Sequence, residues 1–327
     1  MSQITFLFML MKWLTETGKS DIVMICRRSR SIRRKEYDMN LISLIYKRLL
    51  DSERLKSLCA TYAGKPAIFN TEAPDDKQEG WGGKSQYPRI NFTCDMQANE
   101  ERASVGTLNI VAYTESTSLV ILEIEAAIKE CFRDVLLYPE DGGPYSFSWA
   151  RSDPFLLEGN VIGQEISIDM MEYSPQETTD PDPVVALNQY IKELYPESVV
   201  IGVDRLGEIT DTSENPVFYC RLTALNKVNG NNMNTVAWMD CRIAVHLLCP
   251  DNSKNIKMIA AVAQRIAVDE RIILLDYSPM NISEVQLDRQ ADYLKSGQLY
   301  VTGRYGVLKY KAKEHAIMKN VILNKEE

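Results

Sequence analysis

The residues best suited to acid–base chemistry are scarce in this sequence. Only two histidines occur among the 327 residues, His246 and His315. Histidine is the commonest acid–base group near neutral pH, but no Ser or Cys nucleophile motif accompanies either one. His246 falls in the polar register of a predicted strand, and His315 falls in the C-terminal tail. The pattern favours surface or hydrogen-bonded structural histidines over catalytic ones.

Phosphate and metal motifs are also missing from the sequence. It contains neither a GxxxxGK[ST] loop nor a GxGxxG motif. The Gly-rich segment 80–83 lies in a predicted loop with no helix after it, so a phosphate cradle is not expected there. The acidic pairs near residues 140 and 181 lie in Pro-rich turns and are predicted to be solvated. We therefore expect no cofactor, no metal and no catalytic residue, and we interpret the chain as a non-enzyme.

Seven cysteines are scattered along the chain with no CxxC spacing. Most fall within apolar periodic segments, where a free cysteine acts as a small hydrophobic residue. The odd number and the scattered placement are typical of a reducing compartment.

Charge separates the N-terminus from the body of the protein. Residues 1–38 hold eight Lys/Arg and four Asp/Glu, a net +4, so the total of −8 leaves −12 for residues 39–327. An acidic body disfavours tight nucleic-acid binding, although DNA could slide through a channel with such a wall. The basic run 27–35 is compatible with a nucleic-acid arm, but we predict that residues 1–38 are a leader outside the fold. A normal domain start appears at Met39.

The elements after the leader follow one order twice. Apolar periodicity predicts helices at 40–60 and 117–133 in the first half, and at 184–195 and 250–268 in the second. Alternation predicts a hairpin between each pair of helices and strands after it. The predicted strands are 66–69, 88–96, 106–113, 145–149 and 162–173, then 199–203, 216–225, 237–247, 272–275, 281–287 and 298–308.

A Pro-rich segment separates the two halves. Residues 174–183 contain three prolines and no large apolar residue, and proline disfavours both helix interiors and strand ladders. The sequence therefore predicts an α+β protein of two tandem modules, each a mostly antiparallel sheet packed with two helices. The predicted bounds are a module at 39–173, a linker at 174–183, a module at 184–310 and a tail at 311–327.

The element order of each half resembles that of the tail-terminator, or tail-completion (neck), proteins of tailed phages and phage-tail-like particles. The matching segments are NLISLIYKRLLDSERLKSL, YPRINF, TLNIVAY and LVILEIEAAIKECF in the first half. In the second half they are DPVVALNQYIKELYP, PVFYCRL, MDCRIAVHLL and GQLYVTGRYGVLKY. The resemblance covers about residues 39–310. Members of the family are usually single modules, so the doubling departs from the pattern.

The resemblance implies a structural virion protein that forms a ring, terminates the tail tube and joins tail to head. The implied homo-oligomer is a hexameric ring, or a trimer with pseudo-sixfold symmetry. The implied partners are the tail tube protein, the head–tail connector proteins and the sheath of a contractile tail. DNA would only pass through the channel, and no membrane would be involved. Assembly would take place in the bacterial cytoplasm.

Three other functions remain open from the sequence. They are a head–tail adaptor or other tail structural protein, an enzyme with an unrecognised site, and a nucleic-acid binder acting through residues 27–35. Exposed loop aromatics and the two hairpin tips are the expected contacts with other subunits. These residues are Trp81, Tyr87, Asn99, Arg102, Asn231 and Asn232.

Overall fold

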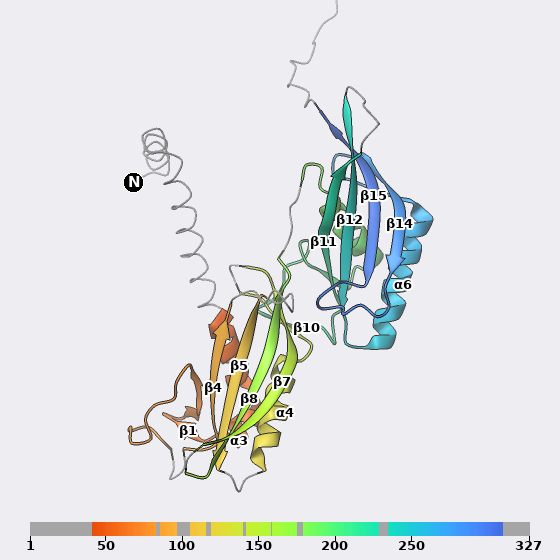
Figure 1. The fold of residues 1–327 in the computed structure, drawn as a ribbon. Coiled ribbons are helices and arrows are strands. Elements are labelled where there is room, and N and C mark those ends of the chain that lie inside the picture. Colours follow the sequence, from red (N-terminus) through yellow and green to blue (C-terminus); the bar gives the residue numbers. More distant parts are fainter. Residues whose placement is uncertain are drawn as a thin grey trace, which may run out of the picture. The chain divides into compact units, whose positions relative to one another are not determined.

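The structure is a computed structural model that describes residues 41–82, 86–96, 105–115, 119–139, 142–157, 159–174, 179–228 and 235–309. These residues form two compact units (Figure 1). The first unit contains the described residues up to Ser174, together with Asp204–Val217 and Leu248–Asp251. The second contains the remainder. The predicted leader 1–38 and tail 311–327 lie outside the described residues.

The first unit has a seven-stranded sheet in the order β10-β6-β7-β8-β5-β4-β3. Its strands are β3 Ile68–Asn70, β4 Arg89–Asp95, β5 Gly106–Glu115, β6 Val135–Leu137, β7 Tyr145–Leu157, β8 Val161–Glu172 and β10 Ile209–Asp211. A separate small hairpin joins β1 Thr61–Tyr62 to β2 Lys65–Pro66. Helical residues 41–51, α3 Glu53–Leu58 and α4 Val120–Phe132 complete the unit.

The second unit has a six-stranded sheet in the order β13-β14-β15-β12-β11-β9. Its strands are β9 Val199–Val200, β11 Val217–Lys227, β12 Val236–Leu248, β13 Arg271–Ile273, β14 Pro279–Leu287 and β15 Leu299–Leu308. Its helices are α5 Pro183–Leu194 and α6 Asn252–Asp269.

The two sheets repeat one strand order. Reading each from the strand after its second helix gives β6-β7-β8-β5-β4-β3 in the first unit and β13-β14-β15-β12-β11-β9 in the second. Each strand therefore has a counterpart at the same place in the other sheet. This confirms the predicted α+β class with two tandem sheet-based modules. The first sheet has one extra strand, β10, beyond β6.

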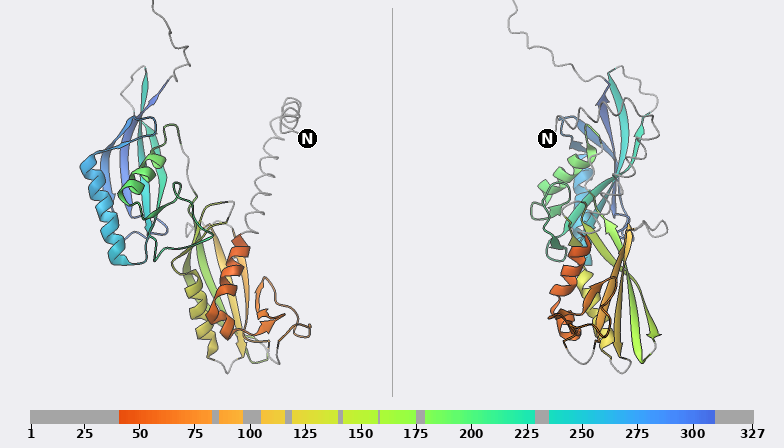
Figure 2. Two further views of the ribbon diagram at one scale, coloured as in Figure 1. Left: turned by 180° about the vertical axis from the view of Figure 1, so that it is seen from behind. Right: turned by 90° about the vertical axis from the view of Figure 1, so that its left-hand side faces the viewer.

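In each unit the helices cover one face of the sheet (Figure 2). In the first unit, alternate side chains of β4 and β5 point into the core beneath them, including Ile90, Phe92, Leu108 and Ile110. Buried residues from the helices meet them there, including Leu41, Ile45, Leu49 and Ile128. The alternation predicted along both strands therefore separates the side chains of this core from those on the opposite face of the sheet.

Local signals in the sequence explain where the helix α5 begins. Asp182 is its N-cap, and its Oδ1 accepts hydrogen bonds from the N–H groups of Val184 at 2.8 Å and Val185 at 3.2 Å. Pro183 occupies the first helical turn, where its missing N–H costs nothing.

The segment 204–215, which lies between the predicted strands 199–203 and 216–225, contains the strand β10. It is only three residues long, with Ile209 as its one large apolar residue. A single apolar residue gives no alternation, so the strand state arises from pairing with β6 and not from a local pattern. The sequence also failed to predict β6, which is equally short.

Candidate functional site

The histidine that the structure describes has a structural role. His246 is buried, with Nδ1 2.9 Å from the carbonyl oxygen of Tyr293. Arg221 Nε donates to His246 Nε2 at 3.2 Å. Because arginine cannot accept a hydrogen bond, Nε2 is the acceptor and Nδ1 carries the proton. Burial lowers the pKa of His246 to about 4. A neutral ring whose two nitrogens are both hydrogen-bonded is a poor acid–base catalyst. The second histidine, His315, lies outside the described residues.

The cysteines and carboxylates form no metal centre in the part of the chain that the structure describes. The thiols of Cys59, Cys131, Cys220, Cys241 and Cys249 are buried, and that of Cys94 is half-buried. Burial raises the pKa of Cys59 to about 12 and that of Cys241 to about 11. These thiols are packed as hydrophobic groups.

Trp81 packs against two aromatic residues instead of pointing freely into solvent. Its ring lies edge-on to those of Tyr62 and Phe69, with centroids 5.1 Å and 5.9 Å away. Its indole N–H donates to the carbonyl oxygen of Asp75 at 3.3 Å. Trp81 therefore anchors the loop after β3 to the β1–β2 hairpin.

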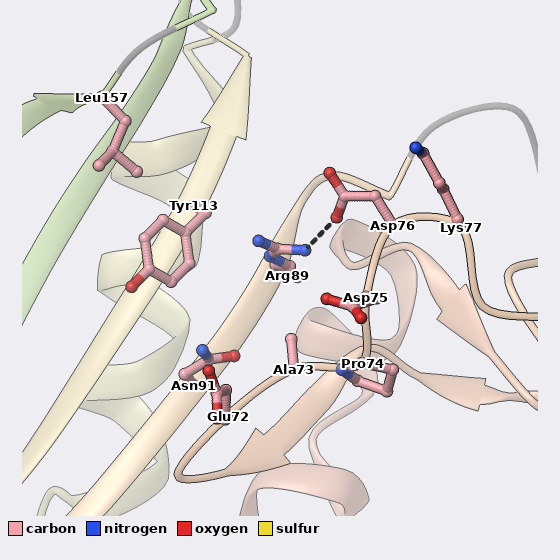
Figure 3. Close-up of a pocket in the computed structure, with 10 residues that line it drawn as sticks. All are labelled: Glu72, Ala73, Pro74, Asp75, Asp76, Lys77, Arg89, Asn91, Tyr113 and Leu157. Atoms are coloured by element: carbon pink, nitrogen blue, oxygen red, sulfur yellow. Dashed lines mark hydrogen bonds and ion pairs between the residues drawn. The ribbon is translucent and has the colours of Figure 1, made fainter.

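Tyr87 contributes to a second anchor of the same loop, at Arg89. The Arg89 guanidinium carbon lies 5.0 Å from the centre of the Tyr87 ring and 5.6 Å from that of Tyr113. Its Nη1 forms an ion pair with Asp76 at 3.0 Å (Figure 3). Burial raises the pKa of Tyr113, and the Arg89 charge opposes this shift. Of the predicted interface residues, Trp81 and Tyr87 thus belong to one loop, whereas Asn99, Arg102, Asn231 and Asn232 lie outside the described residues.

A pocket of about 650 Å³ lies between this loop and the helix-free face of the sheet (Figure 3). Residues 72–77 of the loop form one wall, and Arg89, Asn91 and Tyr113 line the sheet side. Arg89 Nε and Asn91 Oδ1 are buried atoms with no hydrogen-bond partner among the described residues. One free donor beside one free acceptor suits a small polar group, and the residues that line the pocket include no Ser, Cys or His.

The corresponding edges of the two sheets differ in the strands that pair with them. β6 pairs antiparallel with β10, in the register Ile209↔Leu137, Thr210↔Leu136 and Asp211↔Val135. The pairing is extended by Tyr138 N–H donating to the Glu208 carbonyl and Thr212 N–H donating to the Asp134 carbonyl, both at 2.9 Å. All three residues of β6 are buried.

Ion pairs and charges also fasten the strand β10 to the first unit. Lys47 Nζ lies 2.8 Å from Glu208 Oε2. The pKa of Asp211 is lowered, mainly by hydrogen bonds from Ser213 and to a lesser degree by the charge of Arg48. An acidic segment is thus held over the β6 edge by cations of the first helix.

The counterpart strand β13 is the last strand of its sheet among the described residues. Ile282 N–H donates to the Glu270 carbonyl and Leu274 N–H donates to the Ser278 carbonyl, so these residues face β14. Neighbouring residues of an antiparallel strand direct their backbone groups to opposite sides. Arg271 and Ile273 therefore direct their N–H and C=O groups away from the sheet.

Large apolar side chains are exposed around β13. The exposed fractions are 72% for Val268, 52% for Ile273, 53% for Leu275 and 89% for Tyr277. Together with the outward backbone groups of β13, they form a surface that we call the β13 edge (Val268–Tyr277). Exposed apolar edge strands pair readily with other chains. The first unit also exposes apolar residues, on α4 at Leu119 and Leu122 and on β7 at Trp149, Leu156 and Leu157.

None of the helices among the described residues is long and apolar enough to cross a membrane. No protein-family model matches the chain. No curated protein matches it either. Among solved structures, it is similar to a chain described as "Virion of native gene transfer agent (GTA) particle", at 14% identity and a TM-score of 0.28. The match covers 39% of this chain and 91% of that chain. The likeness to this virion component is weak and partial, and at this TM-score it establishes neither fold nor function.

Proposed function

We propose that this chain is a structural protein of a tailed phage or phage-tail-like particle, and that its copies form a ring that terminates the tail tube and joins tail to head. The observation that carries this proposal is the tandem repeat of one strand order, one copy in each unit. A chain with two equivalent modules doubles the number of similar positions around a ring. Three chains then supply six positions, and six chains supply twelve.

The surfaces support assembly more than chemistry. Exposed apolar residues occur in both units, and such surfaces are typical of contacts between proteins. In the described residues, the histidine is buried and neutral, the cysteines pack as apolar groups, and the lining of the pocket beside Arg89 includes no Ser, Cys or His. In this proposal the protein acts through complementary surfaces that contact the tail tube protein and the head–tail connector, and it catalyses no reaction.

The test is the mass of the native assembly in solution. Light scattering on the full chain should give a species of three or six times 37.2 kDa. Particles assembled without the protein should carry tail tubes of uncontrolled length, and adding the protein should restore one length. A chain that stays monomeric at every concentration, and that leaves tube length unchanged, would contradict the proposal.

A head–tail adaptor is the second candidate, supported by the same repeat. The two functions differ in where the ring binds. A terminator caps purified tail tubes in the absence of heads, whereas an adaptor binds DNA-filled heads in the absence of tails. Negative-stain microscopy of the two mixtures separates them.

A further inference from the structure

The strand after the second helix has different neighbours in the two units. β6 follows α4, and β13 follows α6, and each pairs with the next strand of its sheet. Asp134 and Glu270, the residues before these strands, both have positive φ, at 55° and 54°. The two strands are thus equivalent in their order along the chain and in their place in the sheet. Their backbone phases differ by one residue, because the Asp134 carbonyl accepts from Thr212 on the outer side whereas the Glu270 carbonyl accepts from Ile282 on the sheet side. Among the described residues, only β6 is covered by a further strand.

The pairing with β10 covers the outer edge of β6. Leu136, whose backbone faces β10, is 0% exposed, and Ile209 of β10 packs against the core of the unit. In the second sheet, the residues whose backbone groups face outward are Arg271 and Ile273, and Ile273 is 52% exposed. Among the described residues, the second sheet has no counterpart of β10.

The position of β10 in the chain indicates which segment would cover β13. β10 lies in the connection between β9 and β11. The strand order equates β9 with β3 and β11 with β4. The equivalent connection is therefore the loop between β3 and β4, which begins at Thr71 and includes the wall of the pocket described above.

Charge is consistent with this assignment. Residues 204–217 carry five carboxylates or cations, of which four are acidic: Asp204, Glu208, Asp211 and Glu214. Residues 71–79 carry Glu72, Asp75, Asp76 and Glu79 against Lys77 alone. On the β13 edge, Arg271 is exposed, and no ion pair to it exists among the described residues. An acidic segment laid along β13 would bring carboxylates to this arginine, as Glu208 is brought to Lys47 on the β6 edge.

We propose that residues 71–79 of a second copy of this chain add a strand to the β13 edge, in the way that β10 adds a strand to β6. The segment is held in place for this by two anchors, the Asp76–Arg89 ion pair and the packing of Trp81 on Tyr62. Added strands gain affinity from main-chain hydrogen bonds, and Arg271 and Ile273 supply the outward donors and acceptors. The apolar side chains of Leu275 and Tyr277 become covered in the complex.

The contact is head-to-tail, because the loop of one copy meets the β13 edge of the next. A repeated contact of this kind closes into a ring or continues as a filament. The inference therefore deepens the proposed function and rests on it in part: it names the surface through which neighbouring copies of the ring bind one another. It also requires that each copy carry one donor segment and one acceptor edge.

Three variants of the full chain test the contact. The edge variant is Arg271→Glu with Ile273→Lys, which places charges on an edge strand and so blocks pairing. The loop variant is Glu72→Lys with Asp75→Lys, which leaves the Asp76–Arg89 ion pair in place. The control is Lys257→Glu with Gln290→Lys, which makes the same change in net charge as the edge variant at two exposed positions outside β13.

Light scattering gives the outcome. The wild type and the control should assemble alike, and the edge and loop variants should each be monomers of about 37.2 kDa with wild-type circular dichroism. Mixed together, the two monomeric variants should form a dimer of twice this mass and nothing larger, because one intact edge and one intact loop remain in the pair. This rescue shows that both variants are folded.

Two results would overturn the inference. One is an edge variant that keeps the wild-type mass, and the other is a mixture of the two monomeric variants that forms no dimer. If the wild type is a ring in either case, the proposed function stands and only the contact is wrong. A wild type that is monomeric at all concentrations overturns both.

Discussion

Thr212 donates two hydrogen bonds to the carbonyl oxygen of Asp134, one from its backbone N–H and one from its hydroxyl, each 2.9 Å long. The two residues are 78 positions apart in the sequence. They fasten the end of β10 to the residue that leads into β6. Thr212 is buried. Its hydroxyl would therefore lack a hydrogen-bond partner if the bond to Asp134 were lost within the folded protein.

Replacing Thr212 with Val should loosen β10 without changing its shape. The substitution keeps the volume and removes one hydrogen bond, worth about 1 kcal/mol. The Tyr138 amide, which donates to the Glu208 carbonyl across the same pairing, should exchange with deuterium about fivefold faster. Thr223→Val, the same substitution at an exposed residue of β11 whose hydroxyl donates to the Arg242 carbonyl, is the matched control and should leave this rate unchanged. Equal rates in all three proteins would mean that the hydroxyl does not hold the strand.

The stability of the second unit should fall as the pH is lowered from about 6.5 to about 4. Burial lowers the pKa of His246 to about 4 from an ordinary value of 6.5. Between these values the unfolded chain binds a proton that the folded chain does not, so acid favours unfolding. The full effect corresponds to about 3 kcal/mol, and above pH 6.5 His246 contributes no pH dependence.

The measurement is the urea midpoint of the wild type and of His246→Gln at pH 7 and pH 4.5. Glutamine retains a hydrogen-bonding group near Tyr293 and Arg221 but does not titrate. The variant should be less stable at pH 7 and should lose less stability between the two pH values. A loss as large as that of the wild type would assign the acid sensitivity to groups other than His246.

The buried thiols should resist alkylation in the native protein. The thiolate is the reactive form, and burial raises the pKa of Cys59 to about 12 and that of Cys241 to about 11, and also raises that of Cys220. With iodoacetamide at pH 8, peptide mass spectrometry should show modification at the half-buried Cys94 well before these three. In urea all of them should react. Early labelling of Cys59 or Cys241 in the native protein would show that these sites open readily.

Removing the cap of α5 should destabilise the second unit. Asp182→Ala loses the acceptor of the Val184 and Val185 N–H groups and should cost about 1 kcal/mol. Asp182→Asn keeps an oxygen at the same place and is the matched control. The urea midpoints of the two variants should therefore differ, with alanine the lower. Identical midpoints would mean that Asp182 stabilises the protein through contacts other than the cap.

The sequence predicted those parts of the fold that depend on local patterns. Apolar periodicity after the Pro-rich segment 174–183 predicted α5, and the alternation from Ala237 to Leu247 predicted β12. Repeating this reasoning along both halves was sufficient to predict two modules of one fold class. Each of these signals is contained within a few residues of the element that it predicts.

The features that could not be predicted from the sequence depend on contacts between residues far apart in the chain. β10 has one large apolar residue and becomes a strand only because β6 offers its edge. His246 was assigned to the polar side of its strand, and it is buried because Tyr293 and Arg221 satisfy both nitrogens. Trp81 and Tyr87 were predicted as contacts with other subunits because they lie in a loop, and no local pattern indicated that they also pack against Tyr62 and Arg89.

The late position of β10 in the chain has a consequence for synthesis. A ribosome completes β6 at Leu137 and reaches β10 only at Ile209, 72 residues later. At about 5–20 residues per second, about 4 to 14 s pass between the synthesis of β6 and that of β10. During this interval the β6 edge can pair with a strand of a neighbouring nascent chain on the same messenger RNA. The order of translation therefore exposes the first module to mispairing until the second module has begun to emerge.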